Sequence, residues 1–234
     1  MRMTTSVVVL GTLAICLAGC GGGGATPSTT FDLEVGYTNL VKTGRTVNVS
    51  LLGTVTVNGV STQFSGSGTL TFTPSVSASF NNATALSQTE SISGTVTASG
   101  QSAPYSSSVT DYYSTGTLMF LGESTASEFD VASSPFSYPT SVMGGSNGIL
   151  GTINRYSDST MGVALGTAQI SYTVMPPLDP GSPVGVQLTN KIYDTQSALV
   201  ETDVSTYSLT SSGVLTLVSA SVQSASGTLS VSAQ

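Results

Sequence analysis

Hydrophobic and polar residues alternate with a period of two along most of the chain. The alternation is clearest over residues 47–57, 168–174, 184–188 and 214–222. Successive side chains of a strand point to opposite faces, so this pattern predicts strands with one buried face. It predicts roughly a dozen strands and no helix beyond the N-terminal segment. We therefore expect an all-β fold, arranged as an antiparallel β-sandwich or as a meander or barrel.

Turn signals separate the alternating segments. Asn58-Gly59 lies between two of them, and this dipeptide supplies the positive φ angles of a tight hairpin turn. Residues 143–148 and 175–183 are rich in Gly and Pro and are expected to be loops. The stretch 123–145 is the least periodic. We interpret residues 31–234 as a single antiparallel β domain, with a possible internal division near 123–145.

The pattern Gly-Thr-apolar-x-apolar recurs at irregular intervals. A solenoid repeat would space its copies evenly, so we interpret the pattern as a strand start, with glycine at the preceding turn or bulge. The copies begin at Gly53, Gly68, Gly94, Gly116, Gly166 and Gly227.

Charge is scarce along this chain of 234 residues. Only 7% of the residues are charged, against about 25% in ordinary soluble domains. Without Arg2, four basic residues remain against 12 acidic ones. A surface with so few cations repels phosphate backbones, so nucleic acid is excluded as a partner. Polarity comes instead from Ser, Thr, Asn and Gln.

A short apolar run near the N-terminus ends in a cysteine. The run Val7 to Leu17 follows Arg2 and is about half the roughly 20 residues needed to span a bilayer, which is typical of a signal peptide. Leu17, Ala18, Gly19 and Cys20 together resemble the lipobox of bacterial lipoproteins. The resemblance implies a signal peptide over residues 1–19. It also implies acylation of Cys20, with palmitate among the attached chains.

The resemblance also implies a location. Residues 20–30, the acylated Cys20 and the flexible glycine-rich tether after it, would hold the domain at a lipid bilayer in the cell envelope. In such lipoproteins an Asp directly after the cysteine commonly retains the protein in the inner membrane, and here Gly21 occupies that position. We therefore expect anchoring in the outer membrane of a cell that has one, on its periplasmic or its surface face.

The residues offer little catalytic chemistry. The chain has no histidine, which excludes Ser-His-Asp and Cys-His catalysis and most zinc sites. Gly144 to Gly148 spells G-x-S-x-G around Ser146, but a strand-like segment follows where a nucleophile elbow needs a helix. We expect no enzyme activity, no cofactor and no metal site.

Paired carboxylates are the remaining candidates for catalysis or calcium binding. Asp32 and Glu34, Glu128 and Asp130, and Glu201 and Asp203 are each two residues apart. This spacing places both members of a pair on the same face of a strand. We interpret these pairs as solvated faces that keep a weakly charged protein soluble.

Tyrosines supply the candidate binding residues. Tyr112, Tyr113 and Tyr138 lie in the middle third of the chain, around its irregular segment. Tyrosine gives a large contact area at low entropic cost, so such a group suits a glycan or an envelope protein as partner. Buried strand tyrosines with wet hydroxyls are the alternative.

Three functional hypotheses follow. The first is a membrane-anchored envelope lipoprotein whose non-enzymatic β domain has a binding or structural role. The second is a carrier of an apolar ligand within a curved sheet or barrel, which a closed apolar cavity of about 300 Å³ or more would favour. A hydrolase ranks third.

Overall fold

The computed structural model describes residues 29–179 and 181–234, which form a closed antiparallel β-barrel with one helix. The predicted all-β class is confirmed, and the barrel is the arrangement adopted. Residues 1–28, which contain Leu17, Ala18, Gly19 and Cys20, lie outside the described residues. Among the residues described, none of the helices is long and apolar enough to cross a membrane.

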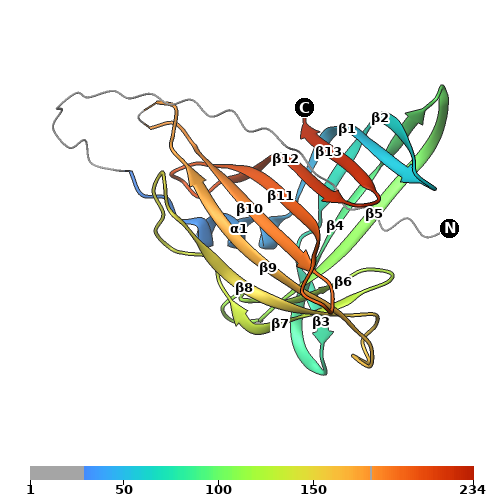
Figure 1. Cartoon of the computed structure of the whole chain (residues 1–234). Coiled ribbons are helices and arrows are strands. Elements are labelled where there is room, and N and C mark those ends of the chain that lie inside the picture. The colour runs from blue at the N-terminus through green and yellow to red at the C-terminus, as the bar shows by residue number, and fades with distance from the viewer. Residues whose placement is uncertain (1–28, 180) are drawn as a thin grey trace.

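The strands follow one another around the barrel in chain order (Figure 1). The first half contains β1 (Arg45–Val57), β2 (Val60–Phe72), β3 (Val76–Phe80), β4 (Ala83–Ala98), β5 (Gln101–Tyr113), β6 (Phe120–Ser124) and β7 (Phe129–Phe136). The second half contains β8 (Asn147–Tyr156), β9 (Ala164–Met175), β10 (Val184–Tyr193), β11 (Leu199–Leu209), β12 (Leu215–Ser224) and β13 (Gly227–Ala233).

Two pairings close the ring. β1 pairs with β13, and β2 pairs with the later part of β4. β3 is therefore an extra strand outside the ring, and it pairs with the first residues of β4. At the β2–β4 seam Gly68 is opposite Gly94. A Cβ atom at Gly68 would lie 2.3 Å from the carbonyl oxygen of Ser93, and one at Gly94 would lie 2.3 Å from that of Ser67. The absence of side chains at this point is what lets the two backbones meet.

These glycines correct the expectation for the Gly-Thr pattern. Gly53, Gly68 and Gly94 lie inside β1, β2 and β4, whereas Gly227 begins β13. The interior glycines serve close approach between neighbouring strands, a role that glycine also has within sheets. The predicted hairpin at Asn58-Gly59 is present, with φ angles of 51° and 78°.

The helix α1 (Leu33–Thr43) was not predicted. Asp32 caps it, since its side chain accepts a hydrogen bond from the Val35 backbone N–H at 2.8 Å, and Gly44 ends it with φ 65°. Eleven residues carry too few turns for a clear helical period, although Leu33, Tyr37 and Leu40 are spaced for one buried face. Asp32 and Glu34 are therefore a cap and a first-turn residue, and the strand pair expected there is wrong.

α1 plugs one end of the barrel. It lies within the outline of the barrel, behind β9 and β10 in Figure 1. Asn39 donates a hydrogen bond to the Gly213 carbonyl in the β11–β12 turn, and the buried Gln88 of β4 donates one to the Leu40 carbonyl. These bonds attach the helix to opposite sides of the ring.

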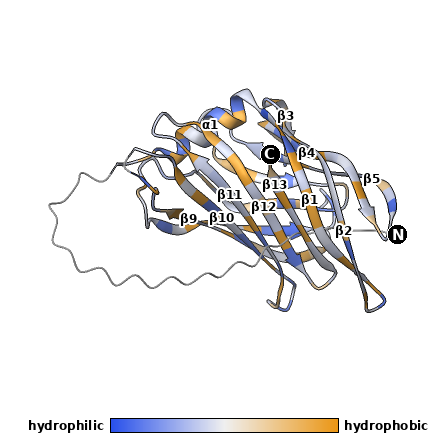
Figure 2. Ribbon diagram, turned by 90° about the horizontal axis from the view of Figure 1, so that it is seen from above, coloured by the Kyte–Doolittle hydropathy of each residue, from blue (hydrophilic) through white to orange (hydrophobic). Residues whose placement is uncertain are grey.

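The two faces of the sheet differ in chemistry. Hydrophobic and hydrophilic residues are interspersed along the labelled strands in Figure 2, as alternation requires. Inward residues form the core, including Val49, Leu51, Leu70 and Leu229. Outward residues are largely Ser and Thr, and Thr54 and Thr228 bond to each other across β1 and β13 at 2.9 Å.

Candidate functional site: an acidic cavity inside the barrel

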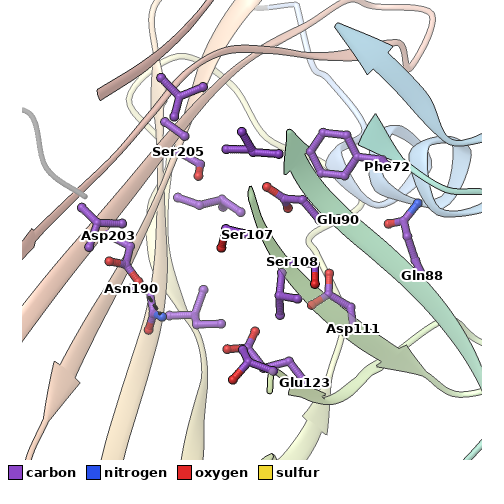
Figure 3. A pocket seen from close by; sticks show the side chains of 18 of the residues that line it. Phe72, Gln88, Glu90, Ser107, Ser108, Asp111, Glu123, Asn190, Asp203 and Ser205 are labelled. Carbon is purple, nitrogen blue, oxygen red and sulfur yellow. Dashed lines mark hydrogen bonds between the residues drawn. The ribbon is translucent and has the colours of Figure 1, made fainter. Parts of the chain in front are cut away.

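A cavity of about 400 Å³ lies inside the barrel, against α1. Tyr37 and Leu40 of the helix contribute to its wall, and the other lining residues come mainly from β4, β5, β10, β11 and β12. Figure 3 shows Glu90, Asp111 and Glu123 on the β4–β6 side and Asp203 and Asn190 on the opposite side. The volume is within the range of small-molecule sites.

Strand register creates a row of polar residues across one wall. Each of the following residues is directly opposite the next on the neighbouring strand, from β4 to β8: Gln88, Asp111, Glu123, Asp130 and Arg155. Three neighbouring carboxyl groups thus face the barrel interior, and like charges directly opposite each other destabilise a sheet. The row ends at a single cation.

That cation is engaged by acidic partners. Arg155 lies 2.5 Å from a Glu128 carboxylate oxygen and 3.6 Å from one of Asp130. Asp130 is only 4% exposed, and its Oδ1 atom is buried without a hydrogen-bond partner. The single guanidinium therefore leaves one Asp130 oxygen unsatisfied.

The opposite wall carries a second polar group. Asn190 of β10 and Asp203 of β11 are cross-strand partners, and the Asn190 amide donates to Asp203 Oδ2 at 3.3 Å. The Oδ1 atoms of both residues are buried and have no hydrogen-bond partner. Two acceptors on this wall therefore lack a donor.

Burial raises the pKa of carboxyl groups on both walls. Burial, and then the nearby Asp111, raises the pKa of Glu90 to about 8. Burial followed by the Glu201 charge raises the pKa of Asp203 to about 8. Glu90 and Asp203 keep some surface within the cavity, yet protein surrounds them and removes most of their hydration.

The carboxyl groups of the row on β5 to β7 also have raised pKa values. Burial raises the pKa of Asp111 to about 6, while a hydrogen bond from the Tyr113 hydroxyl at 3.2 Å opposes the rise. Burial also raises the pKa of Glu123 well above its usual range and that of Asp130 to about 7, in the latter case against the pull of Arg155. Near neutral pH this wall is therefore partly protonated.

Five tyrosines also line the cavity, namely Tyr37, Tyr105, Tyr113, Tyr138 and Tyr207. The rings of Tyr37 and Tyr138 are stacked with centroids 3.6 Å apart, and Tyr207 meets Tyr37 edge-on at 5.8 Å. Tyr37 is 7% exposed, and burial raises the pKa of its hydroxyl, with the nearby Tyr207 and Tyr138 adding to the rise. The aromatic group lies where α1 meets the strands.

The three tyrosines singled out from the sequence do not form one site. Tyr113 and Tyr138 both line the cavity. Tyr112, whose side chain alternates with that of Tyr113 along β5, packs instead on Phe80, which also stacks on Phe129. Tyr112 therefore belongs to an aromatic cluster outside the cavity, where β3 covers the sheet.

The carboxylate pairs are also placed differently from the solvated faces expected. Asp130 is buried, and Glu201 and Asp203 line the cavity, because their strands turn this face inward. Ser146 lies in the turn before β8, and its hydroxyl accepts a hydrogen bond from the Met143 backbone N–H at 3.0 Å.

Sequence reasoning missed Glu90, Asp111 and Glu123 as site residues. Each is isolated along the chain, so no local spacing connects them. The chain carries only a weak indication of their role. Each is a charged residue at a position where the alternation predicts a side chain that points inward. Only strand register brings them together.

The fold and the cavity define a closed β-barrel with an acidic interior. Within the described residues, no group of three or more acidic or cysteine side chains is arranged to hold a metal ion. No protein family matches the chain, and neither a curated protein nor a solved structure is significantly similar to it. The function must therefore be argued from the cavity.

Proposed function

We propose that this chain is an envelope lipoprotein whose barrel binds a small molecule in its internal cavity, without enzymatic activity. The observation that carries the proposal is the cavity of about 400 Å³ inside the barrel. A purely structural module gains stability by filling its core, and an unfilled interior loses contacts. The cavity therefore favours a binding role.

The lining modifies the carrier hypothesis. Aliphatic side chains such as Ile92, Leu188 and Val222 contribute to the wall, but so do five carboxyl groups. A purely apolar ligand would exclude water from these carboxyl groups and offer them no hydrogen bond in return, which is unfavourable. The ligand we propose is amphipathic, with a polar group as well as an apolar body.

The N-terminal motif supplies the anchoring part of the proposal. Cys20 within the lipobox-like sequence would carry the acyl chains. Residues 21–30 would connect it to Phe31, which comes directly before the cap of α1. Phe31 pairs with Val142 and is buried, so the tether would reach the barrel beside α1. The lipid bilayer is then the partner of Cys20, and Gly21 favours the outer membrane.

Binding in the cavity is tested with the full chain, purified from membranes and placed in lipid nanodiscs. Saturation-transfer NMR against a panel of neutral, anionic and cationic small molecules detects ligands, with empty nanodiscs as the background. Ser205→Phe fills the cavity, since Ser205 lines it. We expect this variant to abolish binding.

The matched control is Thr206→Phe, one residue further along β11 and on the outward face. It adds the same ring outside the cavity, and we expect it to leave binding unchanged. Circular dichroism verifies that both variants fold. A panel without any ligand sensitive to Ser205→Phe would refute the binding function.

A further inference from the structure

We infer that the cavity binds a small organic amine in its protonated form, with the ammonium group against Asp203 and Asn190 and an apolar body along β10, β12 and β13. The inference rests on the binding function proposed above and names the chemical class of its ligand.

The charged residues in the lining are all acidic. Five carboxyl groups line the cavity, from Glu90, Asp111, Glu123, Glu201 and Asp203, and no Lys or Arg is among the described lining residues. Arg155, the basic residue of the row across the wall, is not among the lining residues and is held by Glu128 and Asp130. In a site of low dielectric constant such an arrangement attracts a cation and rejects an anion.

The unsatisfied polar atoms point to a donor. The Oδ1 atoms of Asp203 and Asn190 are buried acceptors without partners, and they belong to residues bonded to each other. Tyr37, a residue more than nine-tenths buried, lines the same cavity and adds a further hydroxyl oxygen to its wall. A primary ammonium group carries three N–H donors and would satisfy several such acceptors at once.

The surroundings of Asp203 select an organic cation over a bare metal ion. Val222 of β12 is the cross-strand neighbour of Asp203, and Leu229 of β13 is in turn the neighbour of Val222. Leu188 of β10 lies two residues from Asn190 and also lines the cavity. This wall would bury an alkyl or aryl body, whereas a metal ion would need several carboxylates close together.

Binding of a cation would displace protons. Raised pKa values keep Glu90 and Asp203 largely protonated at neutral pH, and a bound ammonium group favours the ionised form. Other charged or titratable groups surround Glu90 and Asp203 and affect this proton exchange. They are Asp111 on β5, Glu123 on β6, Asp130 on β7, Arg155 on β8, Glu201 on β11 and Tyr37 on α1. Affinity for the amine should therefore increase with pH.

The test compares n-hexylamine with 1-hexanol on the full chain in nanodiscs, by isothermal titration calorimetry. The two probes share a six-carbon chain, and the amine stays protonated below about pH 9. At pH 8.5 we expect the amine to bind at least tenfold more tightly than the alcohol. That preference should fall at least fivefold at pH 5.5. Titrations at pH 7 in buffers of different ionisation enthalpy should show net proton release.

Asp203→Asn removes the charge of the binding wall without changing its size. We expect it to reduce the preference for the amine at least fivefold while 1-hexanol binds as before. Asp179→Asn is the control, because it removes one negative charge from an exposed loop. Equal binding of the two probes in a manner sensitive to Ser205→Phe would overturn the amine inference and leave the cavity function standing. Absence of any amine binding would overturn the inference as well.

Discussion

Asp111 on β5 and Glu123 on β6 are directly opposite each other and line the same cavity. Two ionised carboxylates in this relationship repel each other, and burial removes the water that would screen them. The barrel tolerates the pair because burial raises both pKa values, so that protons neutralise part of the charge. This relationship makes the stability of the barrel depend on pH.

The barrel should lose stability as the pH rises from about 4 to about 8. Glu90 and Asp203 have pKa values of about 8 in the folded chain and about 4 when unfolded. Within that window the folded state binds more protons, so the free energy of unfolding falls as the pH rises, by about 1–2 kcal/mol per group after allowing for water in the cavity. Urea unfolding followed by circular dichroism at pH 4.5, 6.5 and 8.5 measures this. Stability that rises with pH over this range would contradict it.

Replacing Glu123 by Gln should stabilise the barrel at pH 8. The amide keeps the size of the side chain and removes the central charge of the row between Asp111 and Asp130. We expect a gain of about 1 kcal/mol at pH 8 that shrinks as the pH falls, because burial raises the pKa of Glu123 and of its neighbours in the row, so protons neutralise more of the row at lower pH. Asp179→Asn should change stability little at pH 8 or below it. Destabilisation at pH 8 would show that the Glu123 carboxylate has a partner it needs.

The β2–β4 seam should not accept a side chain at Gly68. An added Cβ would lie 2.3 Å from the Ser93 carbonyl oxygen, which belongs to the backbone and cannot move aside cheaply. We expect Gly68→Ala to cost about 3 kcal/mol or to prevent barrel closure. Gly116→Ala is the control, since no atom lies within 4 Å of its added Cβ. Equal melting temperatures for the two variants would mean that the seam is looser than described.

Loss of the helix cap should weaken the plug at the end of the barrel. Asp32→Ala removes the acceptor of the Val35 N–H bond and should cost about 1 kcal/mol. Asp32→Asn keeps an acceptor at the same place and should cost less. Urea unfolding gives both values, and hydrogen exchange at residues 35–37 locates the effect. An identical loss in both variants would assign the effect to charge rather than to capping.

Cys20 should be the only cysteine required for membrane attachment. Cys20→Ser should move the protein to the soluble fraction or leave it uncleaved, and should abolish labelling by a palmitate analogue. Cys16→Ser is the control, because Cys16 lies in the segment that the lipobox resemblance assigns to the signal peptide. Wild-type protein that takes up no palmitate label would refute the anchoring proposal.

The sequence by itself determined the class of fold and the positions of most strands. Period-two alternation is a local signal, because each strand must bury one face whatever its neighbours are, and Asn58-Gly59 needs only its own φ angles. The short helix α1 was not predicted, because three turns give little periodicity. Its clearest sequence signals, the capping residues Asp32 and Gly44, are single residues.

Tertiary structure decided the closure of the barrel and the identity of the site. Gly68 and Gly94 are 26 positions apart, and their meaning depends on their being opposite each other at the seam. Nothing in the local sequence marks Glu90, Asp111 and Asp203 as site residues either. They line one cavity because strands that are distant in sequence pair in a particular register. A carboxyl group on a strand looks the same from the sequence whether it faces water or the interior. Only the closed ring makes one face an interior, and burial there raises the pKa values of ordinary acids so that they hold protons near neutral pH.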